Sequence, residues 1–236
     1  MTGSPVALVT GATEGIGRAT ALALGRAGYR IGVCARTPSR LRAVLEEFAQ
    51  AGITAHGHPA DVGVESDVRQ MVAQVTGALG PVDVLVNNAG VAIVRPFDQL
   101  SLDDWDTTMA TNLRSLYLVT REVLPGMRQR KSGAIVNIAS LAGRNGFVGG
   151  TAYAASKHAV LGFSRALLLE VRKDDVRVIA ICPGSVDTAL IREQSMLKPD
   201  PARILRAEDV ADTVLSALRL PQRATVSELD VRPTNP

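Results

Sequence analysis

The stretch "VALVTGATEGIGRAT", residues 6–20, joins a short apolar run to a helical pattern through a turn with three glycines. Gly11, Gly15 and Gly17 have the spacing G-x-x-x-G-x-G, which differs from the G-x-G-x-x-G of the best-known dinucleotide fingerprint. The physics is shared, because glycines let the backbone turn sharply and approach a pyrophosphate, and the helix that follows directs free N–H groups at it. A glycine-rich turn without a ligand is the alternative, which the position after a first strand disfavours.

Short apolar runs alternate with amphipathic patterns along the chain. The predicted strands are residues 6–10, 30–35, 53–60, 82–88, 133–140, 176–184 and 225–231. The predicted helices lie near residues 17–28, 38–51, 65–79, 101–130, 151–173 and 207–220. Strand–helix alternation predicts βαβ units with right-handed crossovers. We therefore expect an α/β fold: one Rossmann-like domain over residues 1–236, with a doubly wound parallel sheet of about seven strands and helices on both faces.

The composition fits a sizeable core. Of the 236 residues, 46% are hydrophobic and only 3% aromatic, so aliphatic side chains build that core. The 26 cationic and 23 anionic side chains are mixed, which argues against nucleic-acid binding. The sequence predicts no signal peptide, no membrane span and no metal site, and Cys34 and Cys182 lie in apolar runs as free thiols. We expect a cytoplasmic protein without nucleic-acid or membrane partners.

The least regular stretch is residues 185–206, which follows the sixth predicted strand. Doubly wound sheets bind ligands at the carboxyl ends of their strands, so we interpret this stretch as a mobile substrate loop. An ordinary surface connection is the alternative.

The end of the second predicted strand discriminates between two dinucleotides. NAD-binding proteins of this architecture carry an acidic residue there, whereas this chain reads "CARTP" at residues 34–38. Arg36 can stack on adenine and pair with a 2′-phosphate, and Arg40 lies one helical turn further on. The missing acid favours NADP(H) over NAD(H), although Glu14 in the glycine turn offers a 2′-phosphate no attraction. A surface role for Arg36 is the alternative.

Two further strand ends carry groups suited to the same ligand. Asp61 and Val62 follow the third predicted strand, where a carboxylate can accept a hydrogen bond from the adenine amino group. The segment "NNAG", residues 87–90, ends the fourth. Its amides can tie neighbouring strands together, and Ala89 and Gly90 leave room for a ribose.

The segment "TAYAASKHAV", residues 151–160, places Tyr153 and Lys157 on one face of a predicted helix, about 6 Å apart at Cβ. Lowering the pKa of a tyrosine from about 10 to about 7 takes roughly 4 kcal/mol. One cation at about 4 Å supplies an amount of that order at an effective dielectric constant of about 20. The pair therefore predicts a phenol that works as an acid/base, with a half-buried ring beside a solvated charge as the alternative.

Two other polar residues fit the same chemistry. Ser140 ends the fifth predicted strand, where its hydroxyl can hydrogen-bond a substrate oxygen beside Tyr153. Asn112 lies within a long helical pattern, an unfavourable place because its side chain competes for backbone hydrogen bonds. A local distortion that holds a water against Lys157 would explain it, and a tolerated polar residue is the alternative.

Six motifs, in this order and spacing, resemble the short-chain dehydrogenase/reductase family in its compact single-domain form. They are "TGATEGIG" (10–17), "NNAG" (87–90), Asn112, Ser140, "YAASK" (153–157) and "PGSVDT" (183–188), within a match that runs from about residue 5 to 190. The resemblance implies that Asn112, Ser140, Tyr153 and Lys157 form a catalytic tetrad. In that tetrad Tyr153 protonates the alkoxide during reduction, and Lys157 lowers the pKa of Tyr153 and binds the nicotinamide ribose.

The resemblance also extends to cofactor, substrate and assembly. It implies that Pro183, Gly184 and Thr188 fix the nicotinamide, and that the protein is a homodimer or homotetramer. The predicted cofactor contacts are Gly11, Thr13, Glu14, Gly15, Ile16, Gly17, Arg36, Arg40, Asp61, Val62, Asn88, Ala89, Gly90, Tyr153, Lys157, Pro183, Gly184, Val186 and Thr188. The predicted substrate contacts are Ala142, Arg144, Phe147, Val148 and Leu190. Arg144 is a candidate partner for a substrate carboxylate or phosphate, with a surface arginine as the alternative.

These patterns together predict an NADP(H)-dependent oxidoreductase that interconverts a small-molecule carbonyl and a secondary alcohol. Many relatives, including 3-oxoacyl-carrier-protein reductases, end in a glycine-rich tail, whereas this chain ends "ATVSELDVRPTNP". This difference favours the broader bacterial carbonyl and hydroxy-acid reductases.

Three other functions fit the sequence less well. Arg36 disfavours an NAD-dependent alcohol dehydrogenase on the same fold, and the complete tetrad disfavours a non-catalytic dinucleotide sensor. A Ser/His/Asp hydrolase is excluded, because Ser164 in "GFSRA" lies within a predicted helix and no histidine has an evident acid partner.

Overall fold

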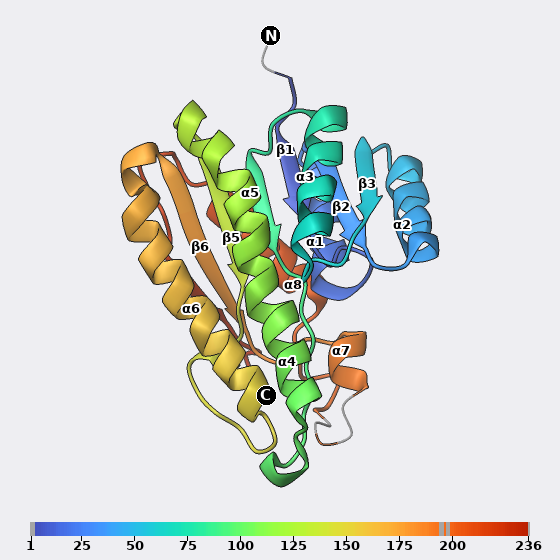
Figure 1. Cartoon of the computed structure of the whole chain (residues 1–236), viewed down its shortest axis with the longest axis vertical. Coiled ribbons are helices and arrows are strands. Elements are labelled where there is room, and N and C mark those ends of the chain that lie inside the picture. The colour runs from blue at the N-terminus through green and yellow to red at the C-terminus, as the bar shows by residue number, and fades with distance from the viewer. Residues whose placement is uncertain (1–2, 194–195, 197–198, 236) are drawn as a thin grey trace.

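A parallel sheet forms the centre of the protein in the computed structural model, which describes residues 3–193, 196 and 199–235 (Figure 1). Its strands are β1 (Val6–Val9), β2 (Arg30–Ala35), β3 (Ala55–Pro59), β4 (Val84–Asn87), β5 (Gly133–Ile138), β6 (Val176–Pro183) and β7 (Glu228–Val231). Within the described ranges the sheet has seven strands in the order β3-β2-β1-β4-β5-β6-β7, and all neighbours are parallel. The predicted fold class is confirmed.

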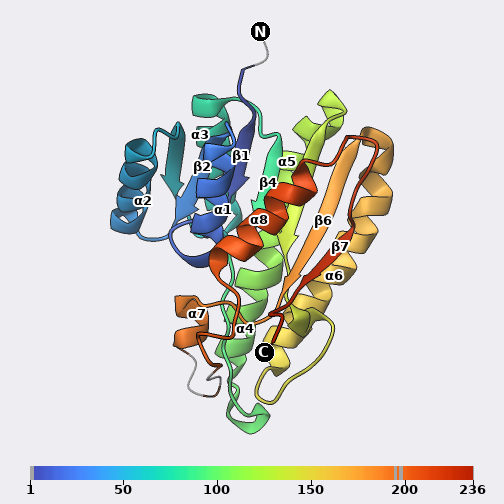
Figure 2. The same cartoon turned by 180° about the vertical axis from the view of Figure 1, so that it is seen from behind.

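Helices cover both faces of the sheet, as the two opposite views show (Figures 1 and 2). One face carries α1 (Gly15–Arg26), α2 (Pro38–Gln50) and α8 (Ala207–Leu218), and the other α3 (Glu65–Leu79), α5 (Ser115–Arg130) and α6 (Thr151–Val171). The alternation along β1 explains why a hydrophobic core lies on each face of the sheet, because successive strand side chains point to opposite faces. Ala7 and Val9 belong to the core under α1 and α8, whereas Val6 and Leu8 belong to the core under α3 and α5.

The predicted helix over residues 101–130 is built from three pieces. Helix α4 (Leu102–Met109) begins with the capping box of Ser101 and Asp104, as their spacing indicates. A single π-helical turn, η2 (Ala110–Arg114), then leads into α5. Short 3-10 turns lie elsewhere: η1 (Phe97–Gln99), η3 (Leu141–Gly143) and η4 (Arg172–Asp174).

The strand order places a crevice at the carboxyl end of β1. This strand pairs with β2 on one side and with β4 on the other, so the chain connections leave it in opposite directions. Such a switch point is where open α/β sheets bind ligands. In the part of the chain that is described, no helix is long and apolar enough to cross a membrane.

The ends of the predicted substrate loop, residues 185–206, lie against each other. Val186 and Leu205 form a parallel bridge, and the backbone N–H of Asp187 donates to the carbonyl of Leu205 at 2.8 Å. The short helix α7 (Ala189–Arg192) lies between these ends. Positions 194, 195, 197 and 198 of this loop lie outside the described residues.

Candidate active site

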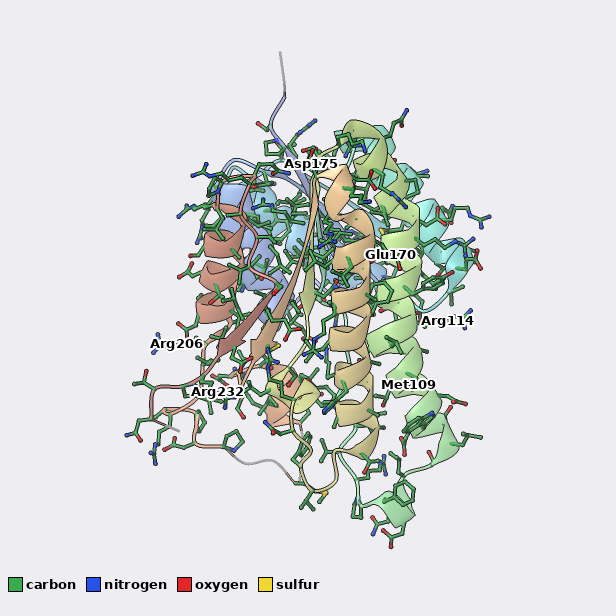
Figure 3. All side chains as sticks on the ribbon, turned by 90° about the vertical axis from the view of Figure 1, so that its left-hand side faces the viewer. Met109, Arg114, Glu170, Asp175, Arg206 and Arg232 are labelled. Carbon is green, nitrogen blue, oxygen red and sulfur yellow. The ribbon has the colours of Figure 1, made fainter. Side chains whose placement is uncertain are left out.

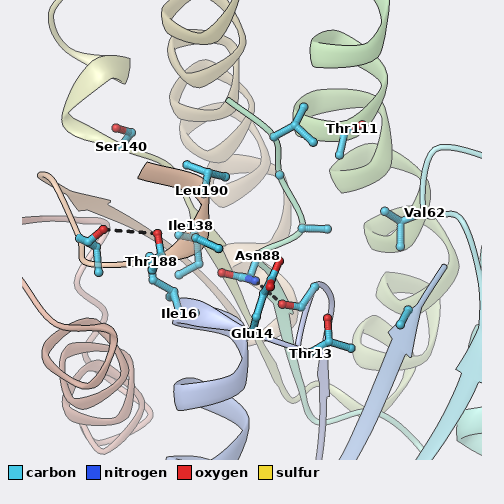
Figure 4. Close-up of a pocket in the computed structure, with 18 of the residues that line it drawn as sticks. Thr13, Glu14, Ile16, Val62, Asn88, Thr111, Ile138, Ser140, Thr188 and Leu190 are labelled. Carbon is cyan, nitrogen blue, oxygen red and sulfur yellow. Dashed lines mark hydrogen bonds between the residues drawn. The ribbon is translucent and has the colours of Figure 1, made fainter. Parts of the chain in front are cut away.

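A cavity of about 280 Å³ opens at the carboxyl ends of β1 to β6 (Figure 4). Every predicted cofactor contact except Gly17 lines it, and so do Ser140, Tyr153, Lys157 and Leu190. In Figure 4, Ser140 and Val62 lie at opposite ends of the view, with Asn88 between them. The cavity therefore joins the glycine turn to the Tyr153 segment.

The glycine turn needs glycine for two different reasons. Gly11 and Gly15 have φ of +63° and +53°, in the left-handed region that side chains disfavour. Gly17 has an ordinary φ but no space, since a Cβ there would lie 2.2 Å from the carbonyl oxygen of Gly11 and 2.3 Å from Nδ2 of Asn88. That same Nδ2 donates to the carbonyls of Thr10 and Gly11 at 2.9 and 3.0 Å, so the turn is fastened to the end of β4.

The start of α1 suits an anion. Its N-cap, Glu14, makes no side-chain capping hydrogen bond, and its first turn carries no acidic side chain. Helix N-terminal N–H groups attract phosphate when nothing else satisfies them. The turn and the helix start together fit the pyrophosphate of a dinucleotide.

The end of the cavity near β2 is basic. Arg36 is exposed there and, among the described residues, has no hydrogen bond or ion pair. Arg40 forms an ion pair with Glu14 at 3.7 Å, which offsets the charge that argued against a 2′-phosphate. Oδ1 of Asp61 accepts from the N–H of Gly63 at 2.8 Å, which fixes the orientation of that carboxylate.

Ser140, Tyr153 and Lys157 meet at the other end. The Lys157 ammonium lies 5.7 Å from the centroid of the Tyr153 ring and donates to the carbonyl of Ile138 at 2.9 Å. Oγ of Ser140 accepts from the N–H of Ala142 at 3.1 Å, so its own hydrogen can be donated toward Tyr153 or toward a substrate oxygen.

Burial controls the electrostatics of this group. It raises the pKa of Tyr153, which the hydrogen bond from Ser140 lowers only in part. Lys157 is only 5% exposed, and burial lowers its pKa to about 8. The sequence predicts that Lys157 lowers the pKa of Tyr153. In the structure the net direction for Tyr153 is upward, because desolvation of the phenol is the largest influence on it.

Asn112 lies behind the cavity rather than in its wall. It is buried in the π-helical turn, where Oδ1 accepts from the N–H of Val91 at 2.8 Å. Its Nδ2 donates to the carbonyl of Val91 at 2.9 Å and to Oγ of Ser156 at 3.0 Å. The predicted helix distortion is present. Asn112 ties the segment after β4 to α6, and its Oδ1 lies 3.3 Å from where a Cβ of Gly90 would stand.

The other predicted substrate contacts lie outside the cavity lining. Arg144 is bound to Asp230 at 2.6 Å and to Glu228 at 2.8 Å, so its guanidinium is neutralised by β7 and is not free for a substrate anion. Val148 is 84% exposed. Phe147 packs against Tyr153, and the N–H of Ala142 orients Ser140.

Sequence reasoning missed part of the lining. These residues are Cys34, Ala35, Thr37, Ala60, Val91, Thr111, Ile138, Ala139, Ala189 and Ile191. Most adjoin a predicted contact at a strand end, so extending each motif by one residue would have found them. Burial raises the pKa of Cys34 to about 11, which makes it an unreactive wall residue.

Comparison with known proteins agrees with this geometry. Residues 5–197 match the family described as short chain dehydrogenase. The chain belongs to the short-chain dehydrogenase/reductase family. It is therefore an oxidoreductase by family, as its motifs predict.

Relatives within the short-chain dehydrogenase/reductase family are similar over most of the chain. A Streptomyces coelicolor protein named "Putative ketoacyl reductase" is 46% identical over 189 residues, which are 79% of this chain and 72% of the relative. A solved structure of an actinorhodin polyketide ketoreductase variant with NADPH is 38% identical, with a TM-score of 0.91, over 98% of this chain and 96% of that one. A metagenomic short-chain oxidoreductase in complex with NADP is 36% identical, with a TM-score of 0.86, over 99% of each chain.

The names of these relatives differ from one expectation. The C-terminal tail favoured broader carbonyl and hydroxy-acid reductases over oxoacyl reductases, whereas two of the three relatives are named as reductases of ketoacyl or polyketide compounds. The family match ends at residue 197, so the tail that carried the expectation lies beyond it.

Proposed function

We propose that this chain is an NADP(H)-dependent reductase that interconverts a carbonyl and a secondary alcohol. The observation that carries the proposal is the convergence of Ser140, Tyr153 and Lys157 on the cavity that also contains the glycine turn and the start of α1. A bound nicotinamide dinucleotide supplies or accepts the hydride. The side chains of the cavity supply the proton and hold the substrate oxygen.

The proton comes from the phenol of Tyr153. As the carbonyl carbon becomes tetrahedral, negative charge grows on the substrate oxygen, and Tyr153 donates its proton there. Ser140 donates a second hydrogen bond to the same oxygen, because Ala142 already occupies one lone pair of its hydroxyl. The nearby Lys157 ammonium stabilises the tyrosinate that remains. In alcohol oxidation each transfer runs in reverse.

Asn112 supports this group from behind. Its three hydrogen bonds hold the segment after β4 against α6, the helix that carries Tyr153 and Lys157. A site beside Gly90, close to both Oδ1 of Asn112 and Nζ of Lys157, suits the water that the sequence predicts.

The preference for NADP(H) rests on Arg36. Its guanidinium is exposed at the end of β2, has no partner among the described residues, and lies where the adenine ribose of a dinucleotide would bind. Two of the similar solved structures are named with NADPH and NADP, which supports the same choice. Because the relatives include ketoacyl and polyketide reductases, ketoacyl compounds are the first substrates to test.

Calorimetric titration of the cofactor-free protein tests this proposal. We expect NADPH to bind at least about tenfold more tightly than NADH, and Arg36→Ala to weaken NADPH binding by about tenfold or more while weakening NADH binding much less. A preference for NADH would instead favour an NAD-dependent alcohol dehydrogenase. Tight binding without turnover of any carbonyl would favour a dinucleotide sensor, and no binding of either nucleotide would refute the proposal.

A further inference from the structure

Phe147 and Lys157 are the aromatic and the cationic neighbour of the Tyr153 ring among the described residues. The ring of Phe147 meets it edge to face, with centroids 6.3 Å apart and planes inclined at 67°. Lys157 is the second neighbour, at 5.7 Å from the centroid. The proposed mechanism gives a task to Lys157 and none to Phe147.

The edge-to-face contact fixes the rotation of the phenol. Aromatic pairs prefer this geometry because the positive edge of one ring meets the negative face of the other. Turning Tyr153 about its Cα–Cβ bond would break this contact and move the phenol oxygen relative to Ser140, whose side chain lowers the pKa of Tyr153.

Gly150, the residue before α6, leaves the space that the Phe147 ring fills. A Cβ at position 150 would lie 2.3 Å from Cζ and 2.4 Å from Cε1 of that ring. The backbone φ of Gly150 is −96°, which other residues adopt freely. Glycine is therefore required at position 150 because the Phe147 ring needs the space, and not because of the backbone conformation.

Two backbone hydrogen bonds anchor the segment from Phe147 to Gly150. The N–H of Gly150 donates to the carbonyl of Phe147 at 3.0 Å, and the N–H of Arg95 donates to the carbonyl of Gly149 at 2.9 Å. Gly149 has φ of +78°, a left-handed turn that returns the chain to α6. The backbone thus holds the half-buried Phe147 ring beside Tyr153.

We infer that Phe147 is a positioning residue, which holds the Tyr153 phenol in line with Ser140 and Lys157 and shields it from water, and that Gly150 makes room for it. This inference rests on the proposed function, since it assumes that Tyr153 transfers the proton. The role differs from the substrate contact predicted from the sequence. A positioning residue acts on the rate of the chemical step, whereas a substrate contact acts first on KM.

Truncation of the ring separates these roles. We expect Phe147→Ala to lower kcat about tenfold or more, with KM and the Kd for NADPH changed less than about threefold. Phe147→Tyr keeps a ring and should restore most of kcat. Phe97→Ala is the matched control, since it makes the same truncation at a ring that is 75% exposed, and it should behave as wild type. A raised KM with unchanged kcat in Phe147→Ala would assign Phe147 to the substrate and overturn the inference.

Titration of Tyr153 tests the contact without turnover. Tyrosinate absorbance is followed against pH, and the Tyr153 signal is isolated by subtracting the Tyr153→Phe variant. Because burial raises the pKa of Tyr153, opening its environment in Phe147→Ala should lower that pKa, whereas Phe97→Ala should leave it unchanged. If the wild type reduces no carbonyl, the proposed function fails on its own, and the titration still decides whether Phe147 controls the phenol.

A double-mutant cycle tests the part played by Gly150. Gly150→Ala should reproduce the loss of kcat, because its Cβ displaces the Phe147 ring. In the Gly150→Ala, Phe147→Ala double variant the ring is already absent, so the loss should be no larger than in Phe147→Ala alone. If the double variant loses kcat by the product of the two single losses, the inference is overturned. It is also overturned if Phe147→Ala keeps both the wild-type kcat and the wild-type Tyr153 titration.

Discussion

At the scale of single residues, the buried ammonium of Lys157 has a cost that depends on pH. Its pKa is about 8 in the folded protein against a reference value of 10.5. Between these two pH values the unfolded chain binds more protons than the native one, so stability rises with pH. The loss of folding stability caused by burying the ammonium is fully present below pH 8 and disappears as the pH approaches 10.5.

Lys157→Met provides the corresponding prediction. The variant has no group to titrate here, so wild type should gain stability relative to it by about 3 kcal/mol between pH 8 and pH 10.5. Urea unfolding of both proteins across this range measures the difference. A difference that does not change with pH would mean that Lys157 is not buried as a charged group.

Tyr153→Phe removes one oxygen from the proposed acid. We expect kcat to fall by about 10²- to 10⁴-fold, because no other group in the cavity replaces the proton donor. The Kd for NADPH should change less than about twofold, since the ring and its packing remain. Single-turnover kinetics with NADPH and a ketoacyl substrate measure the first effect and calorimetry the second. A variant that keeps the wild-type rate would contradict the assignment of Tyr153.

The Arg144→Ala variant distinguishes a structural role of Arg144 from a substrate-binding role. Its ion pairs with Glu228 and Asp230 fasten the segment after Ser140 to β7. We expect Arg144→Ala to lower the free energy of unfolding by about 1 kcal/mol, with KM changed less than about twofold. Thermal unfolding and steady-state kinetics measure the two effects. A large rise in KM at unchanged stability would restore the predicted contact with a substrate anion.

At the scale of elements, the strand–turn–helix unit of β1 and α1 depends on close backbone contact at Gly17. Gly17→Ala should destabilise the protein by about 1–3 kcal/mol and weaken NADPH binding at least about tenfold, because its Cβ would meet the carbonyl of Gly11. Gly77→Ala in α3 is the matched control. Its Cβ would meet nothing within 4 Å, so it should stabilise by up to about 1 kcal/mol. Urea unfolding and calorimetry measure both; similar effects of the two variants would contradict this account.

At the scale of the whole molecule, α5 and α6 lie side by side over one face of the sheet (Figures 1 and 3). They carry exposed apolar side chains: Tyr117 on α5 is 48% exposed and Leu169 on α6 is 61% exposed. Family resemblance predicts a homodimer or homotetramer. We propose that the exposed surface of α5 and α6 forms part of the interface between the subunits. Sedimentation equilibrium should give two or four times the mass of the chain, and Leu169→Lys should weaken association. A monomer at micromolar concentration would contradict the prediction.

Local patterns were enough to predict the elements and most of the cavity lining. Strands show alternating or continuous apolar residues, and helices show apolar residues that recur every three or four positions. Each element can therefore be predicted from a short window of sequence. A parallel sheet then gathers its strand ends at one edge, which is why Gly11, Arg36, Asp61, Asn88 and Ser140 line a single cavity although they lie far apart in sequence. The unfavourable place of Asn112 within a helix predicted a local distortion, and the structure has a π-helical turn there.

The sequence by itself determined the fold class, the family and the residues at the strand ends. The tertiary structure decided which side chains are free. Arg144 looks available in the sequence, yet its partner Asp230 lies 86 positions away, on a strand that reaches it only after the sheet is assembled. Burial of Tyr153 and Lys157, and the Phe147 ring above Gly150, likewise arise from packing between distant segments. Desolvation and charge pairing depend on all neighbours in space, and the periodicity of the sequence does not reveal which residues those neighbours are.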